Sequence, residues 1–237
     1  MMMKTLDRNF LSSRKRALLF LVLLVQGFSH LGQAQEETKA AAATSVQPAD
    51  PAKDTGVSHT NSLGMSFVSP RGLEFQIGIY EVTVGEFAKF SADSGYRRDA
   101  KPLYFAQDSN HPVVNINLED ARAFCVWLTR KERKEKLLSN EQSYRLPTDR
   151  EWDAAVGLTA SSGQASQIYG DERDFPWGDE WPPPAAAGNY AADEIEGYED
   201  PFSYTSPRGS FRANEDGIFD LGGNVWEWTS DPSTSDQ

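Results

Sequence analysis

The chain has 237 residues, of which 24% are charged and 39% are hydrophobic, and its formal net charge is −12. A charge of that sign repels nucleic acids and anionic membrane surfaces, so the composition argues against binding to either. It suits a protein that binds cations, although solubility alone explains it equally well. Residues 1–34 hold five basic residues and one acidic residue, so the rest of the chain carries about −16.

The N-terminus has the pattern of a secretory signal. Basic residues between Lys4 and Arg16 precede an unbroken apolar run at 17–25, and residues 32–34 form a small-x-small cleavage site. The run is shorter than the ~20 residues that cross a bilayer, and an uncleaved N-terminal anchor is the alternative. In either case we expect the rest of the chain to be exported, to the periplasm or the extracellular space.

Composition divides the chain into a signal peptide at 1–34, a flexible linker at 35–60 and one folded domain at 61–237. The linker is rich in Ala, Thr, Pro, Asp and Lys, and it offers little to bury. The folded part is long enough for a single domain with a hydrophobic core. Cys125 is the only cysteine in the sequence, so these residues form no internal disulfide.

Capping patterns mark three helix starts. Thr83 is followed three residues later by Glu86, and Thr148 by Glu151, which is the spacing of a capping box. Asn117 is expected to cap another helix, with acidic residues in the first turn that favour the helix dipole. The apolar stripe of that helix includes residue 125, so we expect a buried structural cysteine rather than a reactive thiol. Residues 129–136 are entirely polar, so this helix is expected to end in solvent.

The strands are expected to be short and the second half of the chain irregular. Residues 75–80 alternate in polarity and predict one strand, and residues 113–116 are a second candidate. From residue 161 onward, prolines, glycines and aromatic residues predict mostly loops. A long irregular region inside a compact domain usually carries function or bound ions.

The residues at 220–228 combine two carboxylates, two glycines, an amide and two tryptophans. Glycine permits backbone conformations that turn carbonyl oxygens inward. Asp220 and Glu227 can join such carbonyls around calcium, which takes six to eight oxygen ligands. The alternative is a turn between buried strands with solvated acids.

Motifs of several other sites are absent from the sequence. It contains no nucleophile elbow, no phosphate-binding P-loop and no H-E-x-x-H zinc motif. His111 is the only histidine in the predicted folded domain. A histidine-based triad or zinc site is therefore not expected.

Several segments, taken in chain order, carry a family resemblance between about residue 61 and residue 231. They are YEVTVGEF at 80–87, HPVVNI at 111–116 with the helix after it, RLPTDREW at 145–152, FPWGD at 175–179, GNY at 188–190 and GGNVWEW at 222–228. This ordered set resembles the formylglycine-generating enzyme, or sulfatase-modifying factor, family. The resemblance implies an α+β, C-type-lectin-like fold that is loop-rich, with short strands and about three helices, here without its last strands.

The resemblance also implies two calcium sites with a structural role. The matching ligands are Asn189, Asp200 and the carbonyls of Tyr190 and Phe202 for the first site, and Asp220, Glu227 and the carbonyls of Gly223 and Val225 for the second. Asp220 stands where some members have asparagine, and an oxygen ligand is kept. Such ions replace missing hydrogen-bonded structure in loops. The alternative is that these acids cap turns without a metal.

Catalytic members of the family oxidise a sulfatase cysteine to formylglycine with copper and molecular oxygen, and two cysteines near their C-terminus hold the copper. This chain ends at Gln237, before the segment that carries that pair, and Cys125 matches a helix position instead. We therefore expect no catalytic residue here, and copper only if a further C-terminal segment exists. The expected molecule is a calcium-stabilised, non-catalytic domain or a fragment, whose partner is a sulfatase or another exported protein.

Three alternatives to that interpretation stay open. One is an active formylglycine-generating oxidase whose catalytic segment is missing from this sequence. Another is a lectin-like module that binds a protein or glycan through exposed tryptophans among Trp177, Trp181, Trp226 and Trp228, although such residues are more often core. The last is a regulatory paralogue that pairs with an active oxidase or with its sulfatase.

Overall fold

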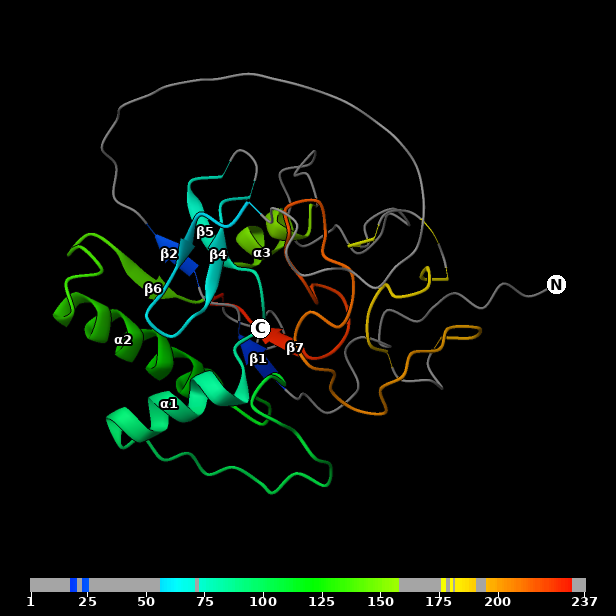
Figure 1. Ribbon diagram of the computed structural model, residues 1–237, viewed down its shortest axis with the longest axis horizontal. Coiled ribbons are helices and arrows are strands. Elements are labelled where there is room, and N and C mark those ends of the chain that lie inside the picture. Colours follow the sequence, from blue (N-terminus) through cyan, green and yellow to red (C-terminus); the bar gives the residue numbers. More distant parts are fainter. Residues whose placement is uncertain are drawn as a thin grey trace, which may run out of the picture.

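The computed structural model describes residues 18–20, 23–25, 56–70, 73–157, 176–177, 180, 182–190 and 195–231. These residues form a loop-rich α+β arrangement of three helices and seven short strands (Figure 1). The helices are α1 (Val84–Ser94), α2 (Leu118–Lys134) and α3 (Asp149–Val156). The strands are β1 (Leu18–Phe20), β2 (Leu23–Val25), β3 (His59–Thr60), β4 (Ser66–Val68), β5 (Phe75–Gly78), β6 (Ser143–Arg145) and β7 (Trp226–Trp228).

Five strands form the main sheet, in the order β3-β4-β5-β2-β6. Every neighbouring pair in this sheet is antiparallel, and Leu24 of β2 lies opposite Gln76 of β5 on one side and Tyr144 of β6 on the other. The remaining strands, β1 and β7, pair in parallel. Both β1 and β2 lie in the segment for which the sequence predicts a signal peptide, and β3 lies at the end of the predicted linker.

The three helices begin where the sequence predicts, and each has a complete capping box. Thr83, Asn117 and Thr148 accept hydrogen bonds from the backbone three residues later, and the acidic residue at that position bonds back to the cap. Each box satisfies amide groups that the first helical turn otherwise leaves without a partner. Helices α1 and α3 end at Gly95 and Gly157, which adopt the left-handed conformation that glycine accommodates without strain.

The main sheet separates two hydrophobic clusters. Consecutive residues of a strand point to opposite faces, and the neighbours Phe67 and Val68 of β4 accordingly belong to different clusters. The cluster with Phe67 contains residues of α1 and α2, including the fully buried Phe124. The cluster with Val68 contains residues of α3 and Ile218. Two helices therefore cover one face, and α3 with a loop segment covers the other.

The second predicted strand, at residues 113–116, is wrong. Only an isolated bridge between Thr83 and Pro112 forms there, and Asn115 has a φ of 56° that ends any extended run. The Arg98 guanidinium donates to the carbonyl oxygens of Val114 at 2.7 Å and Asn115 at 2.9 Å. These carbonyls bond to a side chain instead of a neighbouring strand, so the segment stays irregular.

The prediction that α2 ends in solvent is also wrong in part. Glu132, near the end of the helix, has no exposed surface. Its carboxylate accepts from the Tyr144 hydroxyl at 2.6 Å and from the Ser62 amide at 2.7 Å. A buried carboxylate is tolerated when hydrogen bonds replace its hydration, and these two bonds tie α2 to β6 and to the turn after β3.

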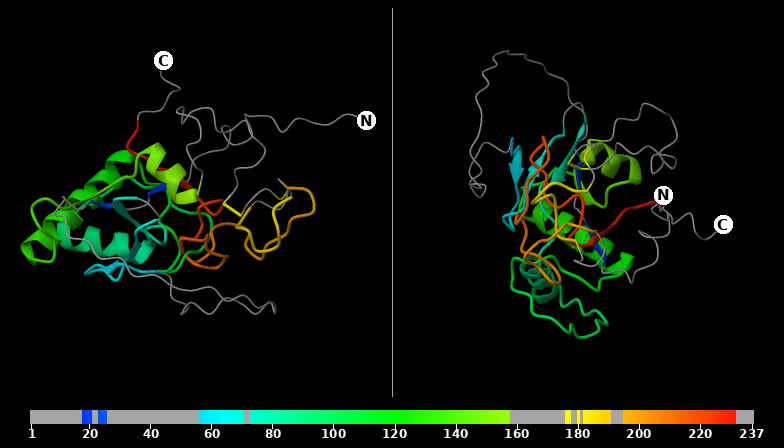
Figure 2. Two further views of the ribbon diagram at one scale, coloured as in Figure 1. Left: turned by 90° about the horizontal axis from the view of Figure 1, so that it is seen from above. Right: turned by 90° about the vertical axis from the view of Figure 1, so that its right-hand side faces the viewer.

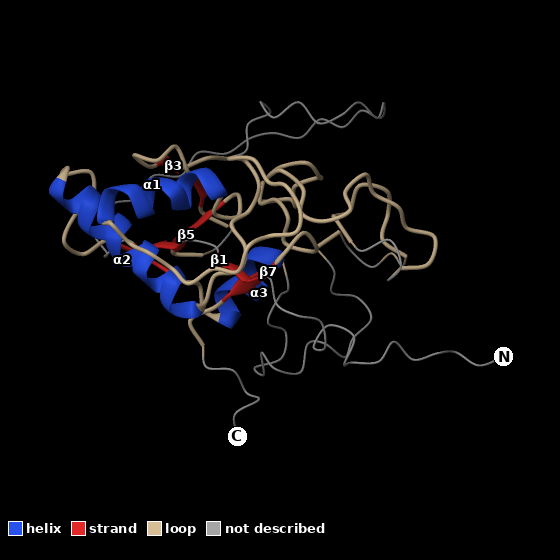
Figure 3. Cartoon of the chain, turned by 90° about the horizontal axis from the view of Figure 1, so that it is seen from below, coloured by secondary structure: helices blue, strands red, loops and turns tan. Residues whose placement is uncertain are grey.

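The described part of the chain after α3 contains only one strand, β7, and no helix. Its loops lie on the opposite side of the molecule from α1 and α2, as the views in Figures 1 and 2 agree. Figure 3 shows the same division, with α1 and α2 on one side, the larger loops on the other and α3 nearer the middle. Among the described residues, no helix is both long and apolar enough to cross a membrane. The predicted metal ligands all belong to the loop-rich side or to β7.

Candidate metal centre

The structure brings the four residues of the first predicted site together. The Asp200 carboxylate accepts from the Tyr190 amide at 2.9 Å and from the Phe202 amide at 2.8 Å. Asn189, next to Tyr190, donates its side-chain amide to the carbonyl of Tyr204 at 2.6 Å. The two loop segments at 189–190 and 200–204 are therefore joined side by side, with Asp200 as the main link.

This first set has hydrogen-bond partners without a metal. Each oxygen of Asp200 accepts one backbone amide, which is how an acid caps a turn. A carboxylate oxygen has a second lone pair, so these bonds leave capacity for a cation. The geometry of this set accommodates either interpretation.

The second predicted set has a buried oxygen that lacks a partner. Asp220 is only 6% exposed, and one of its carboxylate oxygens accepts from the Gly209 amide at 3.2 Å. Its other oxygen, Oδ1, is buried and has no hydrogen-bond partner among the described residues. An ionised oxygen without a partner in a protein interior is costly, and a bound cation is one way to satisfy it.

Glu227 supplies the second carboxylate of this set. It lies in β7, and its side chain accepts a hydrogen bond from the indole Nε1 of Trp152 in α3. The pKa of Glu227 is raised to about 7, mainly by burial of the carboxylate; the Trp152 hydrogen bond acts to lower it and the negative charge of Asp220 acts to raise it. Burial likewise raises the pKa of Asp220 to about 6. Both groups are therefore held in a region that disfavours negative charge.

A third carboxylate, Glu81, belongs to the same region and is not among the ligands that the sequence predicts. It is 1% exposed, and its Oε1 is buried with no partner among the described residues. Burial raises its pKa well above the ordinary value, and Asp220 and Glu227 raise it further. The available signal is an acidic residue three positions after the end of β5, directly following Ile79 and Tyr80.

The close approach of Glu81 and Asp220 follows from backbone pairing beyond the end of β5. The amide of Phe219 donates to the carbonyl of Ile79 at 3.0 Å. This bond places residues 218–220 beside residues 79–81. The packing of Ile218 and Leu221 in the cluster under α3 holds the segment there.

Glycine is required at positions 188 and 223 because a neighbouring backbone carbonyl leaves no room for a Cβ atom. A Cβ on Gly223 would lie 2.7 Å from the carbonyl oxygen of Asn189, and Gly223 has a φ of 95°. A Cβ on Gly188 would collide with the carbonyl of Gly222. Only glycine allows two backbones to approach this closely. The loops of the two predicted sites therefore pack against each other.

These residues fit calcium better than a transition metal. Among the residues that the structure describes, no group of three or more His, Cys, Asp or Glu side chains could hold a metal ion. The same finding covers carboxylate groups, so a calcium ion here would need carbonyl and amide oxygens together with one or two carboxylates. The predicted sets offer that mixture, and Oδ1 of Asp220 is the buried oxygen among them that lacks a partner among the described residues.

The only cysteine of the sequence and the only histidine of the predicted folded domain lie away from the candidate metal sites. Cys125 is buried in the cluster under α1 and α2, as predicted, and burial raises the pKa of its thiol to about 12. A thiol of that kind is not a thiolate ligand at neutral pH. His111 pairs with Asp108 at 2.9 Å in a turn before residue 112. Neither residue forms part of the candidate sites.

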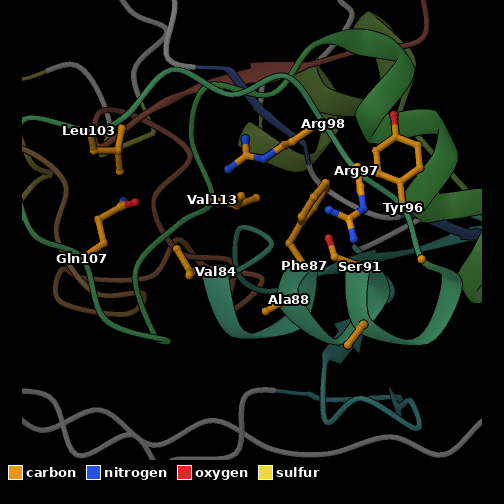
Figure 4. Close-up of a pocket in the computed structure, with 12 residues that line it drawn as sticks. Val84, Phe87, Ala88, Ser91, Tyr96, Arg97, Arg98, Leu103, Gln107 and Val113 are labelled. Atoms are coloured by element: carbon orange, nitrogen blue, oxygen red, sulfur yellow. The ribbon is translucent and has the colours of Figure 1, made fainter.

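A pocket of about 800 Å³ lies between α1 and the segment that follows it (Figure 4). Phe87 and Val113 form part of its apolar wall, and the Arg98 guanidinium lies 5.3 Å from the Phe87 ring centroid. The Arg98 side chain is already bonded to two backbone carbonyls. None of the predicted metal ligands lines this pocket.

Of the four tryptophans considered as ligand platforms, Trp226 is the most exposed of those described. Trp177 is partly buried, and Trp228 packs on the cluster under α1 and α2 and donates to the Ile116 carbonyl. Trp181 lies outside the described residues. Most of the described tryptophan surface thus serves packing.

Comparisons with known proteins agree with the resemblance seen in the sequence. The profile of the sulfatase-modifying factor enzyme 1-like domain family matches residues 68–237. Formylglycine-generating enzyme from Mus musculus is 32% identical over 130 residues, which are 52% of this chain and 28% of that protein. Inactive C-alpha-formylglycine-generating enzyme 2 from Bos taurus is 34% identical over 123 residues, 50% of this chain and 32% of that protein.

A third relative shares a longer region. The chaperone protein LppX from Paenibacillus barcinonensis is 31% identical over 189 residues, which are 68% of this chain and 65% of that protein. The chain therefore spans less than a third of the mouse enzyme and about two thirds of the chaperone. No solved structure shows a significant match.

Proposed function

The chain belongs to the family of sulfatase-modifying factor enzyme 1-like domains, and we propose that its residues 61–237 act as a calcium-stabilised, non-catalytic domain of an exported protein, with the C-type-lectin-like fold of that family. The observation that carries the calcium assignment is Oδ1 of Asp220. That oxygen is buried without a partner among the described residues, and the charge of Asp220 raises the pKa of both Glu81 and Glu227.

Calcium would neutralise this group of carboxylates. The residues that would hold it are Asp220 and Glu227 with the carbonyls of Gly223 and Val225, and, in the first set, Asn189 and Asp200 with the carbonyls of Tyr190 and Phe202. When bound, the ions supply positive charge that hydrogen bonds in these loops do not. Because the unfolded chain cannot assemble either set, binding would stabilise the folded state.

The non-catalytic part of the proposal concerns residues 61–237 alone and rests on their cysteine content. A copper site built on thiolates needs soft sulfur ligands. The sequence offers only Cys125, which is buried and has a raised pKa. A relative named formylglycine-generating enzyme and one named inactive C-alpha-formylglycine-generating enzyme 2 align with this chain over similar lengths, so family membership by itself does not assign the oxidation.

Two measurements on the full chain test this proposal. In the first, the chain is stripped with EDTA and melted with and without calcium, with magnesium as the control cation; we expect calcium alone to raise the melting temperature at neutral pH. In the second, the chain is incubated with copper, oxygen and a sulfatase-derived cysteine peptide, and mass spectrometry scores formylglycine. No product is expected, and its formation would favour the oxidase alternative.

A second candidate function is binding of an exported client protein, because the match to the protein named as a chaperone covers 68% of this chain. The described residues include an aromatic surface cluster of Tyr104, Phe105 and Tyr204, in which Tyr104 is 83% exposed. The rings of Phe105 and Tyr204 stack with centroids 4.7 Å apart. Replacing both tyrosines by serine should reduce suppression of client aggregation, and an unchanged result would count against this candidate.

A further inference from the structure

Asn224 lies where the loops of the two candidate calcium sites meet. Its backbone amide donates to the carbonyl of Asn189 at 2.8 Å, and its Oδ1 accepts from the side-chain amide of Asn189 at 3.2 Å. Asn189 belongs to the first set. The neighbours of Asn224 in sequence, Gly223 and Val225, belong to the second set. A single residue thus contacts one site and is part of the backbone of the other.

The side chain of Asn224 is fully used in this position. Its Oδ1 also accepts from the Ser206 amide at 2.9 Å. Its Nδ2 donates to Oε2 of Glu81 at 2.8 Å and to the Ser206 carbonyl at 3.3 Å. An amide side chain has two acceptor positions and two donor hydrogens, and all four are engaged. The side chain therefore has little freedom to move without breaking several bonds together.

The backbone conformation supports the same conclusion. Asn224 has a φ of 56°, which asparagine tolerates better than most residues other than glycine. The adjacent Gly223 packs directly on the Asn189 carbonyl. A displacement of Asn189 in one loop therefore has to be followed by residues 223–224 in the other.

We propose that the two candidate calcium sites bind as one coupled unit, with Asn224 as the positioning residue that transmits occupancy between them. This inference rests on the proposed calcium-binding function and deepens it. An ion in one site orders the loop of that site, and the bonds of Asn224 order the loop of the other site with it. The second ion then binds to ligands that are already in place. Coupling of this kind acts through ordering and is reciprocal between the two sites.

The expected size of the effect is about fivefold or more in calcium affinity, the lower end of typical coupling between sites. By reciprocity, loss of the first site should weaken the second by the same factor as loss of the second weakens the first. The two predicted sets share no ligand, so removing a ligand of one site does not remove a ligand of the other. A weaker second site would therefore report coupling.

The test is a calcium titration of the EDTA-stripped full chain by calorimetry, with three single variants and two double variants. Asp200→Ala removes a ligand of the first site, and Asp220→Ala removes a ligand of the second. Asn224→Gly removes the side-chain bonds but keeps a residue that accepts a positive φ. Asp200→Ala and Asp220→Ala are then measured again in the Asn224→Gly background. Near-UV circular dichroism checks that each variant is folded.

Three results are expected. Each aspartate variant should retain one site with at least fivefold weaker affinity than in the native chain, and the two factors should agree. The native chain should show a Hill coefficient above one, which does not depend on any variant folding. In the Asn224→Gly background, loss of one site should change the affinity of the other by less than about twofold, since the side-chain bonds from residue 224 to Asn189, Ser206 and Glu81 are lost and only its backbone bond to Asn189 remains.

The opposing results are equally specific. Two sites that bind calcium in the native chain with a Hill coefficient of one, each unaffected by loss of the other, would overturn the coupling and leave the calcium function intact. Coupling that persists in Asn224→Gly would show that the Asn224 side chain does not transmit occupancy between the sites. A native chain that takes up no calcium would instead refute the proposed function.

Discussion

Replacing Asp220 by asparagine should stabilise the calcium-free chain at alkaline pH. The native carboxylate is buried, one of its oxygens lacks a partner among the described residues, and burial raises its pKa to about 6. Because the folded-state pKa lies above the ordinary value of 3.8, the native chain loses stability as pH rises through about 6. Asparagine keeps the shape and removes the charge that causes this loss.

The magnitude follows from the pKa. A rise from 3.8 to about 6 corresponds to about 3 kcal/mol once the group is fully ionised. A domain of this size gains roughly 2–4 °C in melting temperature for each kcal/mol. In EDTA at pH 8 the variant should therefore melt several degrees above the native chain. At pH 4 the native carboxylate is protonated in the folded state, so the difference should largely vanish.

Differential scanning calorimetry in EDTA at pH 4, 6 and 8 measures this prediction. Glu199→Gln serves as the matched control, because Glu199 is an exposed acid in the same loop region. Calcium should raise the melting temperature of Asp220→Asn less than that of the native chain, since the variant retains an oxygen ligand without its charge. A calcium-free variant that melts below the native chain at pH 8, or a difference that is the same at all three pH values, would show that the buried charge of Asp220 does not destabilise the fold.

Three further predictions concern other parts of the molecule. Cys125 should resist a thiol reagent at pH 8 in the folded chain and react once the chain is unfolded in urea, because burial raises its pKa to about 12; rapid labelling of the folded chain would contradict its place in the core. Phe124→Ala should lower the free energy of unfolding by about 3–5 kcal/mol in urea titrations, whereas Val126→Ala on the 47% exposed face of the same helix should change it by less than about 0.5 kcal/mol. Removal of residues 1–34 should speed hydrogen exchange of amides in β5 and β6 relative to α2, because β2 lies between those two strands; equal rates in both forms would show that β2 does not protect them.

Local sequence signals predicted the helices well because their causes are local. Thr83, Asn117 and Thr148 are each followed by an acidic residue at the third helical position, and the capping bonds join residues three apart. The burial of Cys125 followed from the helical period alone. None of these predictions needed contacts between distant parts of the chain.

The errors arose where distant residues decide the outcome. Residues 113–116 have the composition of a strand, but the Arg98 guanidinium donates hydrogen bonds to the carbonyls of Val114 and Asn115. Glu132 has the sequence context of a solvated residue, yet Tyr144 and Ser62 supply the bonds that allow its burial. Periodicity does not report such partners. The same limit applies to β2, whose neighbours β5 and β6 lie far along the chain.

Some features of the candidate site follow from the local sequence, and others depend on contacts between distant residues. The spacing of Asp220, Gly223 and Glu227 in one short motif is enough to suggest a cation site, because all three residues lie close together in the sequence. The contribution of Glu81 and the bridging position of Asn224 depend on pairing across 143 residues. Only the fold reveals that Asn224 touches both predicted ligand sets.

The most direct test of the account is the calcium stoichiometry of the full chain. The EDTA-stripped chain is titrated with calcium by isothermal calorimetry at pH 7.5, with magnesium as the control. We expect two calcium ions per chain, with a matching rise in melting temperature and no comparable response to magnesium. A titration that shows no calcium binding, with a melting temperature that calcium leaves unchanged, would contradict this expectation.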